Sequence, residues 1–240
     1  MKMNRRDLLA GIGSMGAGIV LSGCSGANGP TRAPRRDEEA MGGEVTATED
    51  LMREHGVLRR ALFVYSEAAA RLRSASSVVV LDALYKTARL FRAFGEEYHE
   101  KKLEETYIFP AVKKTGGEAA SLTDTLVAQH SRGREITDYI LAVTKVARLD
   151  PNNAEPLARV MESMVRMYRP HAAREDTIVF PAWKQTLTAK QLDEMGEKFE
   201  DIEQQQFGED GFESAVRQIS DIESELSMTE LSQFTAPPPK

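Results

Sequence analysis

A short motif occurs twice in the chain and limits what the chain can fold into. FPAVKKT at 109–115 matches FPAWKQT at 180–186 at five of seven positions. The same offset aligns three preceding pairs: Glu104 with Glu175, Glu105 with Asp176, and Thr106 with Thr177. Further upstream, DLMREH at 50–55 resembles TLVAQH at 125–130. The chain is therefore predicted to contain two copies of one structural unit, related by an approximate two-fold axis.

Each copy is predicted to be a helical hairpin. Apolar residues recur at helical spacing, and Gly, Pro and Asn interrupt the pattern. The expected helices cover 48–73, 78–109, 118–149, 155–180, 188–207 and 211–226. Thr48 begins the expected cap of the first helix, Thr188 that of the fifth, and Pro110 and Pro181 are expected to end the second and fourth. We therefore expect an all-α fold, with an antiparallel up-down-up-down four-helix bundle at 47–186 and extra C-terminal helices.

The first residues resemble a targeting segment. NRRDLL at 4–9, with Arg5 and Arg6 as its arginine pair, resembles a twin-arginine export signal, and the apolar stretch after it is too short and glycine-rich to span a membrane. LSGC at 21–24 resembles a lipobox, and Cys24 is the only cysteine in the chain. We expect residues 1–23 to be removed and Cys24 to anchor the exported protein by lipid at the periplasmic side of the envelope. The alternative is a disordered basic tail with an incidental arginine pair.

The remaining segments have simpler assignments. Residues 24–46 are rich in Gly, Pro, Ala and charge without apolar periodicity, which predicts a flexible tether. Residues 187–230 are expected to form a C-terminal helical extension that either covers the open end of the bundle or contacts an unknown protein partner, and 231–240 are expected to be disordered. Lys and Arg alternate with Asp and Glu throughout a chain of net charge −6, which excludes a basic nucleic-acid-binding face.

The four histidines of the chain lie at repeat-related positions. Each hairpin has one histidine on its first helix, and a histidine followed by a glutamate on its second: His55, His99 and Glu104, then His130, His171 and Glu175. Inward-facing side chains of four helices converge on a central cavity, where bundles build metal sites. Imidazole and carboxylate ligands suit Fe, Mn or Zn better than Cu(I). A single histidine is more often a hydrogen-bonded core or surface residue, but four at repeat-related positions favour metal ligation.

Other acidic and sulfur-containing side chains are predicted to have structural roles and not to bind metal. A solvated face is predicted for Glu96, Glu97, Glu100 and Glu105. Met161, Met164 and Met167 have helical spacing and are expected to pack in the core.

These residues together resemble the hemerythrin-like (HHE cation-binding) family. The resemblance covers 48–186 and is carried by MREH at 52–55, YH at 98–99, EETYIFP at 104–110, QH at 129–130, and YRPHAARE at 168–175 followed by FP at 180–181. It implies an antiparallel four-helix bundle with a non-haem di-iron centre, whose members bind oxygen or sense oxygen, iron or nitric oxide. By resemblance His55, His99, His130 and His171 are terminal ligands, and Glu104 and Glu175 bridge the two irons.

The chain departs from the family pattern at two positions. Oxygen-carrying members have a second histidine one turn after the third-helix histidine, where this chain has Arg134. The resemblance then implies two histidines per metal, which favours sensing, iron handling or oxidase chemistry over oxygen carriage. The family also places the second-helix glutamate four residues after its histidine, whereas Glu104 is five residues after His99. We therefore predict a single π-bulge between His99 and Glu104; the alternative is that Glu100 ligates in place of Glu104.

Three functional hypotheses follow from the sequence. The first is an envelope protein that binds or senses a diatomic ligand such as O2 or NO, or that handles iron, through two Fe ions, with Mn or Zn as possible substitutes. The second is a di-iron oxidase or peroxidase. The third is a metal-free helical module for protein interaction. A binding role is expected over an enzymatic one, because no substrate pocket can be identified from the sequence.

Overall fold

The computed structural model describes residues 45–74 and 81–239. The expected signal segment with Arg5 and Arg6, the expected lipid-anchor residue Cys24, and the tether up to residue 44 lie outside the described residues. The described residues contain helices and turns and no strand, so the predicted all-α class is confirmed for this part of the chain. None of the helices in the described ranges combines the length and the apolar composition needed to cross a membrane.

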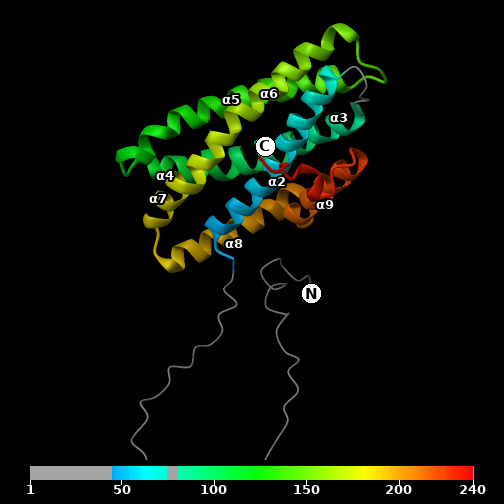
Figure 1. The fold of residues 1–240 in the computed structure, drawn as a ribbon. Coiled ribbons are helices and arrows are strands. Elements are labelled where there is room, and N and C mark those ends of the chain that lie inside the picture. The colour runs from blue at the N-terminus through cyan, green and yellow to red at the C-terminus, as the bar shows by residue number, and fades with distance from the viewer. Residues whose placement is uncertain (1–44, 75–80, 240) are drawn as a thin grey trace, which may run out of the picture. The chain divides into compact units, whose positions relative to one another are not determined.

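Four long helical segments and a C-terminal extension make up the described chain (Figure 1). The first segment is α2 (Ala47–Arg73), and the third is α5 (Gly117–Thr144). The second consists of α3 (Leu81–Leu90), the π-helix η2 (Phe91–Ile108) and α4 (Phe109–Lys113). The fourth consists of α6 (Pro151–Arg174), the π-helix η3 (Glu175–Val179) and α7 (Phe180–Gln185). The extension consists of α8 (Ala189–Phe207), α9 (Gly211–Glu225) and the 3₁₀ turn η4 (Leu231–Phe234).

The four long segments pack around one apolar core. α2 packs against α6, α5 packs against both α6 and the α3–η2 segment, and η2 also contacts α2 (Figure 1). Large side chains from several segments are fully buried between them, including Tyr65, Phe91, Leu103, Ile140 and Leu157. A closely packed core of this kind fixes the rotamers of the side chains around it. It therefore holds in place the polar residues that lie midway along the helices.

The two Phe-Pro motifs lie inside continuous helical segments, so the expectation that Pro110 and Pro181 end their helices is wrong. Each proline is preceded by π-helical hydrogen bonding: the Phe109 N–H bonds to the Glu104 carbonyl, and the Phe180 N–H bonds to the Glu175 carbonyl. A proline ring clashes with the carbonyl four residues earlier in a regular α-helix. The wider π turn displaces that carbonyl, and the chain then continues as α4 and α7.

Helix caps locate most of the remaining boundaries. The first helix begins after Thr46 rather than at the expected cap from Thr48, because Thr46 and Glu49 form a reciprocal capping box. Thr188 caps α8 as predicted, in a second capping box with Gln191. The expected disordered tail differs from the structure over Leu231–Phe234, where the chain forms a 3₁₀ turn and the Phe234 ring packs edge-on against Phe63.

The C-terminal extension packs along the sides of the long helices. α8 contacts α2 and η2, while α9 contacts α2 and α3. The Phe207 ring contacts Phe94 and Tyr98, and Phe199 stacks on Trp183 with ring centroids 5.8 Å apart. Through these contacts the extension shares the apolar core of the repeat and covers one side of η2.

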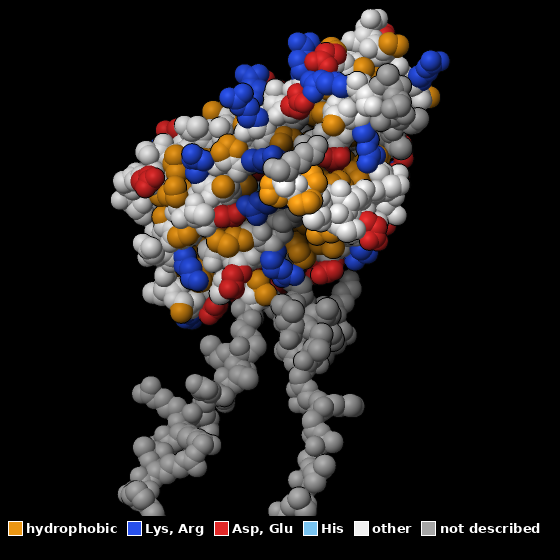
Figure 2. All heavy atoms as spheres, viewed as in Figure 1, with side chains coloured by type: hydrophobic (Ala, Val, Ile, Leu, Met, Phe, Trp, Pro, Cys, Tyr) orange, Lys and Arg blue, Asp and Glu red, His pale blue; other side chains and the backbone are white. Residues whose placement is uncertain are grey.

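The face in Figure 2 carries acidic and basic side chains dispersed among apolar ones.

Candidate metal centre

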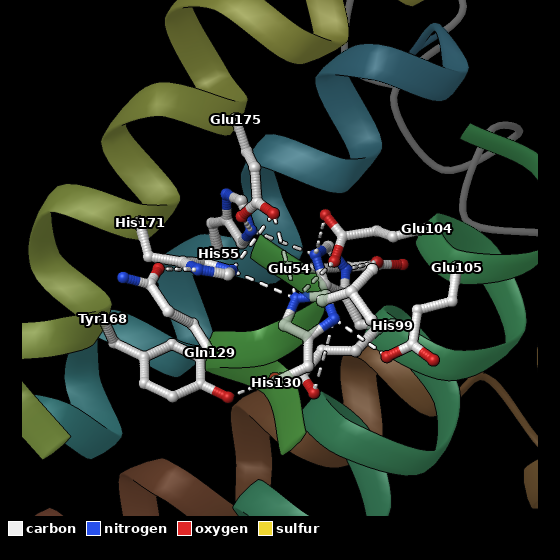
Figure 3. A network of polar contacts seen from close by, with 12 residues as sticks. Glu54, His55, His99, Glu104, Glu105, Gln129, His130, Tyr168, His171 and Glu175 are labelled. Carbon is white, nitrogen blue, oxygen red and sulfur yellow. Dashed lines mark hydrogen bonds and ion pairs between the residues drawn. The ribbon is translucent and has the colours of Figure 1, made fainter. Parts of the chain in front are cut away.

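The four histidines converge from four different helical segments (Figure 3). His55 comes from α2, His99 from η2, His130 from α5 and His171 from α6. The Nε2 atoms of His55 and His99 are 3.0 Å apart, and those of His130 and His171 are 3.1 Å apart. Each histidine is at most 3% exposed. We call His55 and His99 the His55 subsite, and His130 and His171 the His130 subsite.

Two buried glutamates connect the subsites. Glu104 places Oε1 3.4 Å from Nε2 of His99 and Oε2 3.4 Å from Nε2 of His130. Glu175 places Oε2 3.5 Å from Nε2 of His55 and Oε1 3.1 Å from Nε2 of His171. Each carboxylate therefore directs one oxygen to each subsite, which is the geometry of a ligand that bridges two ions.

The carboxylates of Glu104 and Glu175 lack ordinary hydrogen-bond partners among the described residues. All four oxygens of Glu104 and Glu175 are buried, and apart from the histidine Nε2 atoms just named no group among the described residues donates a hydrogen bond to them. Burying an ionised carboxylate without compensation is costly, so such oxygens indicate a missing positive charge. The imidazole and carboxylate donors also fit a first-row divalent ion. These residues therefore fit a pair of metal ions, and the structure forms two corresponding donor groups, each with two histidines and one of the glutamates.

The pKa values show which imidazoles of the site favour the protonated, positively charged form. Burial disfavours the charged form of His99, but Glu104 and Glu54 outweigh burial and raise the pKa of His99 well above its usual value. Glu175 likewise outweighs burial at His171 and raises its pKa. Burial dominates at His130 and lowers its pKa to about 4. One imidazole in each subsite thus attracts a proton to the place that a cation would fill.

Each imidazole is oriented by a second residue through its other ring nitrogen, and Figure 3 labels three of these residues: Glu54, Glu105 and Gln129. The Nδ1 atoms of the four histidines lie within hydrogen-bond distance of one oxygen each: Asp176 for His55 at 2.7 Å, Glu54 for His99 at 2.6 Å, Glu105 for His130 at 2.9 Å, and Gln129 for His171 at 2.8 Å. An Nδ1–H group that donates outward leaves the Nε2 lone pair directed at the centre. We call these four residues the outer partners. Metal-binding histidines characteristically have such partners.

The outer partners follow the internal repeat. Glu105 and Asp176 directly follow the bridging glutamate of their own copy, and each binds the first-helix histidine of the other hairpin. Glu54 and Gln129 directly precede the first-helix histidine of their own copy, and each binds the second-helix histidine of the same hairpin. The sequence interpretation missed this role for all four. The usable signal was their position directly beside a ligand in both copies of the repeat.

A family model for the hemerythrin HHE cation-binding domain matches residues 46–183. The chain belongs to this family. Two uncharacterized proteins, from Mycobacterium tuberculosis strain H37Rv and from Mycobacterium bovis, are each 43% identical to it over 237 residues, which is 97% of this chain and 91% of the relative. No solved structure matches the chain. The alignment with these relatives covers 97% of this chain, so the similarity extends beyond the matched domain into the terminal segments.

Within this hemerythrin HHE domain, Arg134 holds an outer partner. Its Nη2 atom lies 2.5 Å from Oε1 of Glu105, which binds His130. Arg59 follows His55 by one helix turn, as Arg134 follows His130, and forms an ion pair with Asp176, the outer partner of His55. Arg134, which from the sequence was only the replacement of a histidine ligand, thus supplies a positive charge to the outer hydrogen-bond network.

The π-helix accounts for the spacing of Glu104 in this domain. Hydrogen bonds in a π-helix join residues five apart, so His99 and Glu104 lie one turn apart and face the same side. The predicted π-bulge is therefore present, but as an 18-residue π-helix rather than a single bulge. Glu100, the alternative ligand, belongs to neither of the two groups of paired histidines; it lies near Glu105 and Nδ1 of His130 instead. It accepts a hydrogen bond from the Tyr168 hydroxyl and lies 3.4 Å from Nη2 of Arg134.

Two of the four glutamates expected on a solvated face are buried instead. Glu96 is 0% exposed and Glu100 is 1% exposed, whereas Glu97 and Glu105 are partly exposed. The Thr137 hydroxyl donates to Glu96 at 2.5 Å, and Arg92 forms an ion pair with it at 2.9 Å. The π-helix turns this part of the segment by less per residue than an α-helix would, so the face expected to be exposed points partly inward. That expectation was therefore wrong for Glu96 and Glu100.

A small cavity adjoins the centre. Its volume is about 10 Å³, close to what one water molecule needs. Ligand residues and apolar side chains of α2 and α6 line it together: His55, Leu58, Arg59, Leu62, His99, Glu100, Glu104, Tyr168, His171, Ala172 and Glu175. The cavity therefore borders residues of both subsites and has room for a molecule of very few atoms.

Proposed function

We propose that this chain is a hemerythrin-like protein in which an antiparallel four-helix bundle holds two iron ions. His55 and His99 would bind one ion, His130 and His171 the other, and Glu104 and Glu175 would bridge them. The observation that carries this proposal is the placement of each glutamate between the two subsites. All four carboxylate oxygens are buried, and among the described residues only the histidine Nε2 atoms approach them. Mn or Zn would suit the same donors.

The proposed role is to bind or sense a small diatomic molecule such as O2 or NO, or to handle iron. Iron would supply reversible ligand binding and one-electron chemistry. The chain itself supplies a small cavity, bounded on its apolar side by Leu58, Leu62 and Ala172, that excludes larger molecules. The outer partners hold the imidazoles in fixed orientations, and the bundle keeps bulk water from the centre. These features favour binding over turnover of an organic substrate.

A di-iron oxidase or peroxidase is a second candidate because two polar groups line the same cavity. The Tyr168 hydroxyl donates to Glu100, and both residues border the space next to the subsites. The Tyr168 hydroxyl would be placed to supply a proton at this position. Turnover of O2 or peroxide in the presence of a reductant would favour this candidate, whereas reversible binding without turnover would favour the first.

The N-terminal motifs support an envelope location for this function. A twin-arginine pair at Arg5 and Arg6 would export a protein already folded around its metal, and Cys24 would carry the lipid that holds it at the membrane. Replacing Cys24 by alanine should move the exported protein from the membrane fraction to the soluble periplasmic fraction. Recovery of the variant in the membrane fraction would contradict the anchor.

Anaerobic reconstitution with Fe²⁺ tests the di-iron proposal. The full chain should bind about two ions, and exposure to O2 should produce the charge-transfer absorption of a bridged ferric pair. Glu175→Gln should lose bound metal because it removes a carboxylate shared by both subsites, whereas Asp193→Asn on the exposed side of α8 should bind as the parent does. A parent protein that binds no metal would instead support a helical interaction module.

A further inference from the structure

The internal repeat relates the four outer partners in two pairs. The two members of one pair carry the same charge, and the two members of the other pair do not. Glu105 and Asp176, which bind the first-helix histidines, are both carboxylates. Glu54 and Gln129, which bind the second-helix histidines, are a carboxylate and a neutral amide. The His55 subsite therefore has two anionic outer partners, and the His130 subsite has one.

This difference affects how strongly each imidazole binds a cation. A carboxylate that accepts the Nδ1 proton pushes electron density onto the ring and makes Nε2 a better donor, whereas an amide oxygen does so more weakly. His99 has the carboxylate of Glu54, and His171 has the amide of Gln129. An ion bound by His99 would therefore be held more strongly than an ion bound by His171.

Glu54 and Gln129, which occupy equivalent positions in the repeat, also differ in their exposure to solvent. Glu54 is 1% exposed and accepts a hydrogen bond at 3.2 Å from the hydroxyl of Tyr98, whose ring packs against Phe207 of the extension. Gln129 is partly exposed. It borders a surface groove between α5 and α6, about 290 Å³ in volume, that is lined by Leu122, Thr125, Leu126, Gln129, Pro170, His171 and Arg174. The groove reaches a ligand of the His130 subsite from outside.

Glu100 is a further carboxylate near the His130 subsite, and its contacts limit its effect. Its Oε2 atom is 4.0 Å from Nδ1 of His130, but that nitrogen already bonds to Glu105. Arg134 lies against both Glu100 and Glu105 and offsets one of the two charges. Glu100 therefore does not replace the carboxylate missing at Gln129.

We propose that the two metal positions are inequivalent: the ion at the His55 subsite is held more tightly, and the ion at the His130 subsite exchanges through the α5–α6 groove. This inference rests on the proposed two-ion centre and adds an order of loading to it. The first ion would bind between His55 and His99. The second would enter last and leave first.

Anaerobic Fe²⁺ titration of the metal-free full chain against a competing chelator tests the proposal. The parent should show two binding steps separated by roughly 10-fold or more, the usual size of an outer-partner effect. Gln129→Glu should tighten the weaker step by roughly 10-fold and bring the two steps together. Such a gain in affinity cannot come from damage to the fold. Glu54→Gln should weaken the tighter step by a similar factor, with thermal unfolding used to check that it folds.

A matched substitution controls for added charge. Gln218→Glu introduces the same change on the exposed side of α9 and should leave both steps unchanged. Two equal affinities in the parent, or a weaker step unaffected by Gln129→Glu, would overturn the inference while leaving the di-iron proposal intact. A parent that binds no Fe²⁺ would remove the proposed function itself.

The route is tested separately by kinetics. Thr125 lies at the groove and is exposed, so Thr125→Trp should obstruct it. Removal of the weaker ion by a chelator should slow several-fold, with little change in either equilibrium affinity. An unchanged rate would overturn the groove as the exchange route.

Discussion

Arg134 places Nη2 2.5 Å from Oε1 of Glu105, the same oxygen that lies 2.9 Å from Nδ1 of His130. Arg59 contacts Asp176 in the equivalent place, and Asp176 binds His55. Each first-helix histidine is thus held by a carboxylate that an arginine holds in turn. The arginine fixes the rotamer of the carboxylate, and the fixed carboxylate in turn fixes the orientation of the imidazole.

Loss of this arginine should weaken metal binding. Arg134→Leu removes the charge that positions Glu105, and we expect roughly a 10-fold loss of affinity at the His130 subsite. Arg134→Lys should lose less, because it keeps the charge but not the planar guanidinium. Chelator competition measures the change. Arg132→Leu, which removes an exposed arginine paired with Glu135 on the same helix, provides the control. Equal affinities in all these variants would contradict a role for Arg134.

Glu96 should make stability depend on pH. Burial raises its pKa above the usual value, although the Thr137 hydroxyl and Arg92 favour the charged form. The other charged groups that act on it are Arg134 and Asp138. Because the folded-state pKa is raised, the folded protein holds a proton that the unfolded chain has released. This contribution to stability is complete below the unfolded value of about 4.3 and is lost as pH rises through the folded pKa.

Glu96→Gln removes this dependence. The melting temperature of the variant relative to the parent should therefore increase from about pH 4 to about pH 8, because only the parent must ionise a buried carboxyl group. Glu97→Gln is the neighbouring control, since Glu97 is partly exposed and pairs with Lys101 across one helix turn. Calorimetry of the three proteins over this pH range makes the comparison. A pH-independent difference between Glu96→Gln and the parent would contradict the prediction.

The repeat made the inner residues of the centre predictable from sequence. It related the histidines and Glu175 to their counterparts, and an irregular spacing marked Glu104 as the residue that required a π turn. The structure brings all six together, as the resemblance implied. The outer partners were not identified, because Glu54, Glu105 and Asp176 look like ordinary surface acids until the neighbouring helices are placed against them.

The π-helical segments mark the limit of local sequence rules. A proline predicts the end of a helix when the helix is assumed to be α, and that assumption fails before Pro110 and Pro181. The length of η2 could not be inferred from its residues either, since packing against α5 and the extension constrains it. The same segment turned Glu96 and Glu100 inward, which an α-helical projection does not show.

The C-terminal extension should unfold together with the bundle. Ile219 on α9 is 0% exposed and belongs to the common apolar core. Ile219→Ala should therefore cost about 2 to 5 kcal/mol of unfolding free energy, the usual range for such a truncation in a core. Gln218→Ala, next to it and exposed, should change stability by roughly 0.5 kcal/mol or less. Denaturant titration followed by circular dichroism should show one transition in each case. A separate early transition would mean that the extension is an independent unit.

Gly133 and Gly56 should respond in opposite ways to alanine. Both lie within helices, where alanine is favoured over glycine by about 1 kcal/mol. A Cβ atom on Gly133 would lie 3.0 Å from Cε2 of Tyr168 and would overlap its hydroxyl, whereas one on Gly56 meets nothing within 4 Å. Gly56→Ala should thus stabilise the protein by up to about 1 kcal/mol.

Gly133→Ala should destabilise despite its better helix propensity. The Tyr168 ring must move away from α5, which costs about 1 to 3 kcal/mol for overpacking and pulls its hydroxyl from Glu100. Thermal unfolding of both variants beside the parent decides the matter. If Gly133→Ala were as stable as Gly56→Ala, the close approach of Tyr168 to α5 would be incorrect, because the backbone gain would then meet no steric opposition. A lower melting temperature for Gly133→Ala alone would show that this glycine provides the space that lets Tyr168 reach Glu100 beside the candidate metal centre.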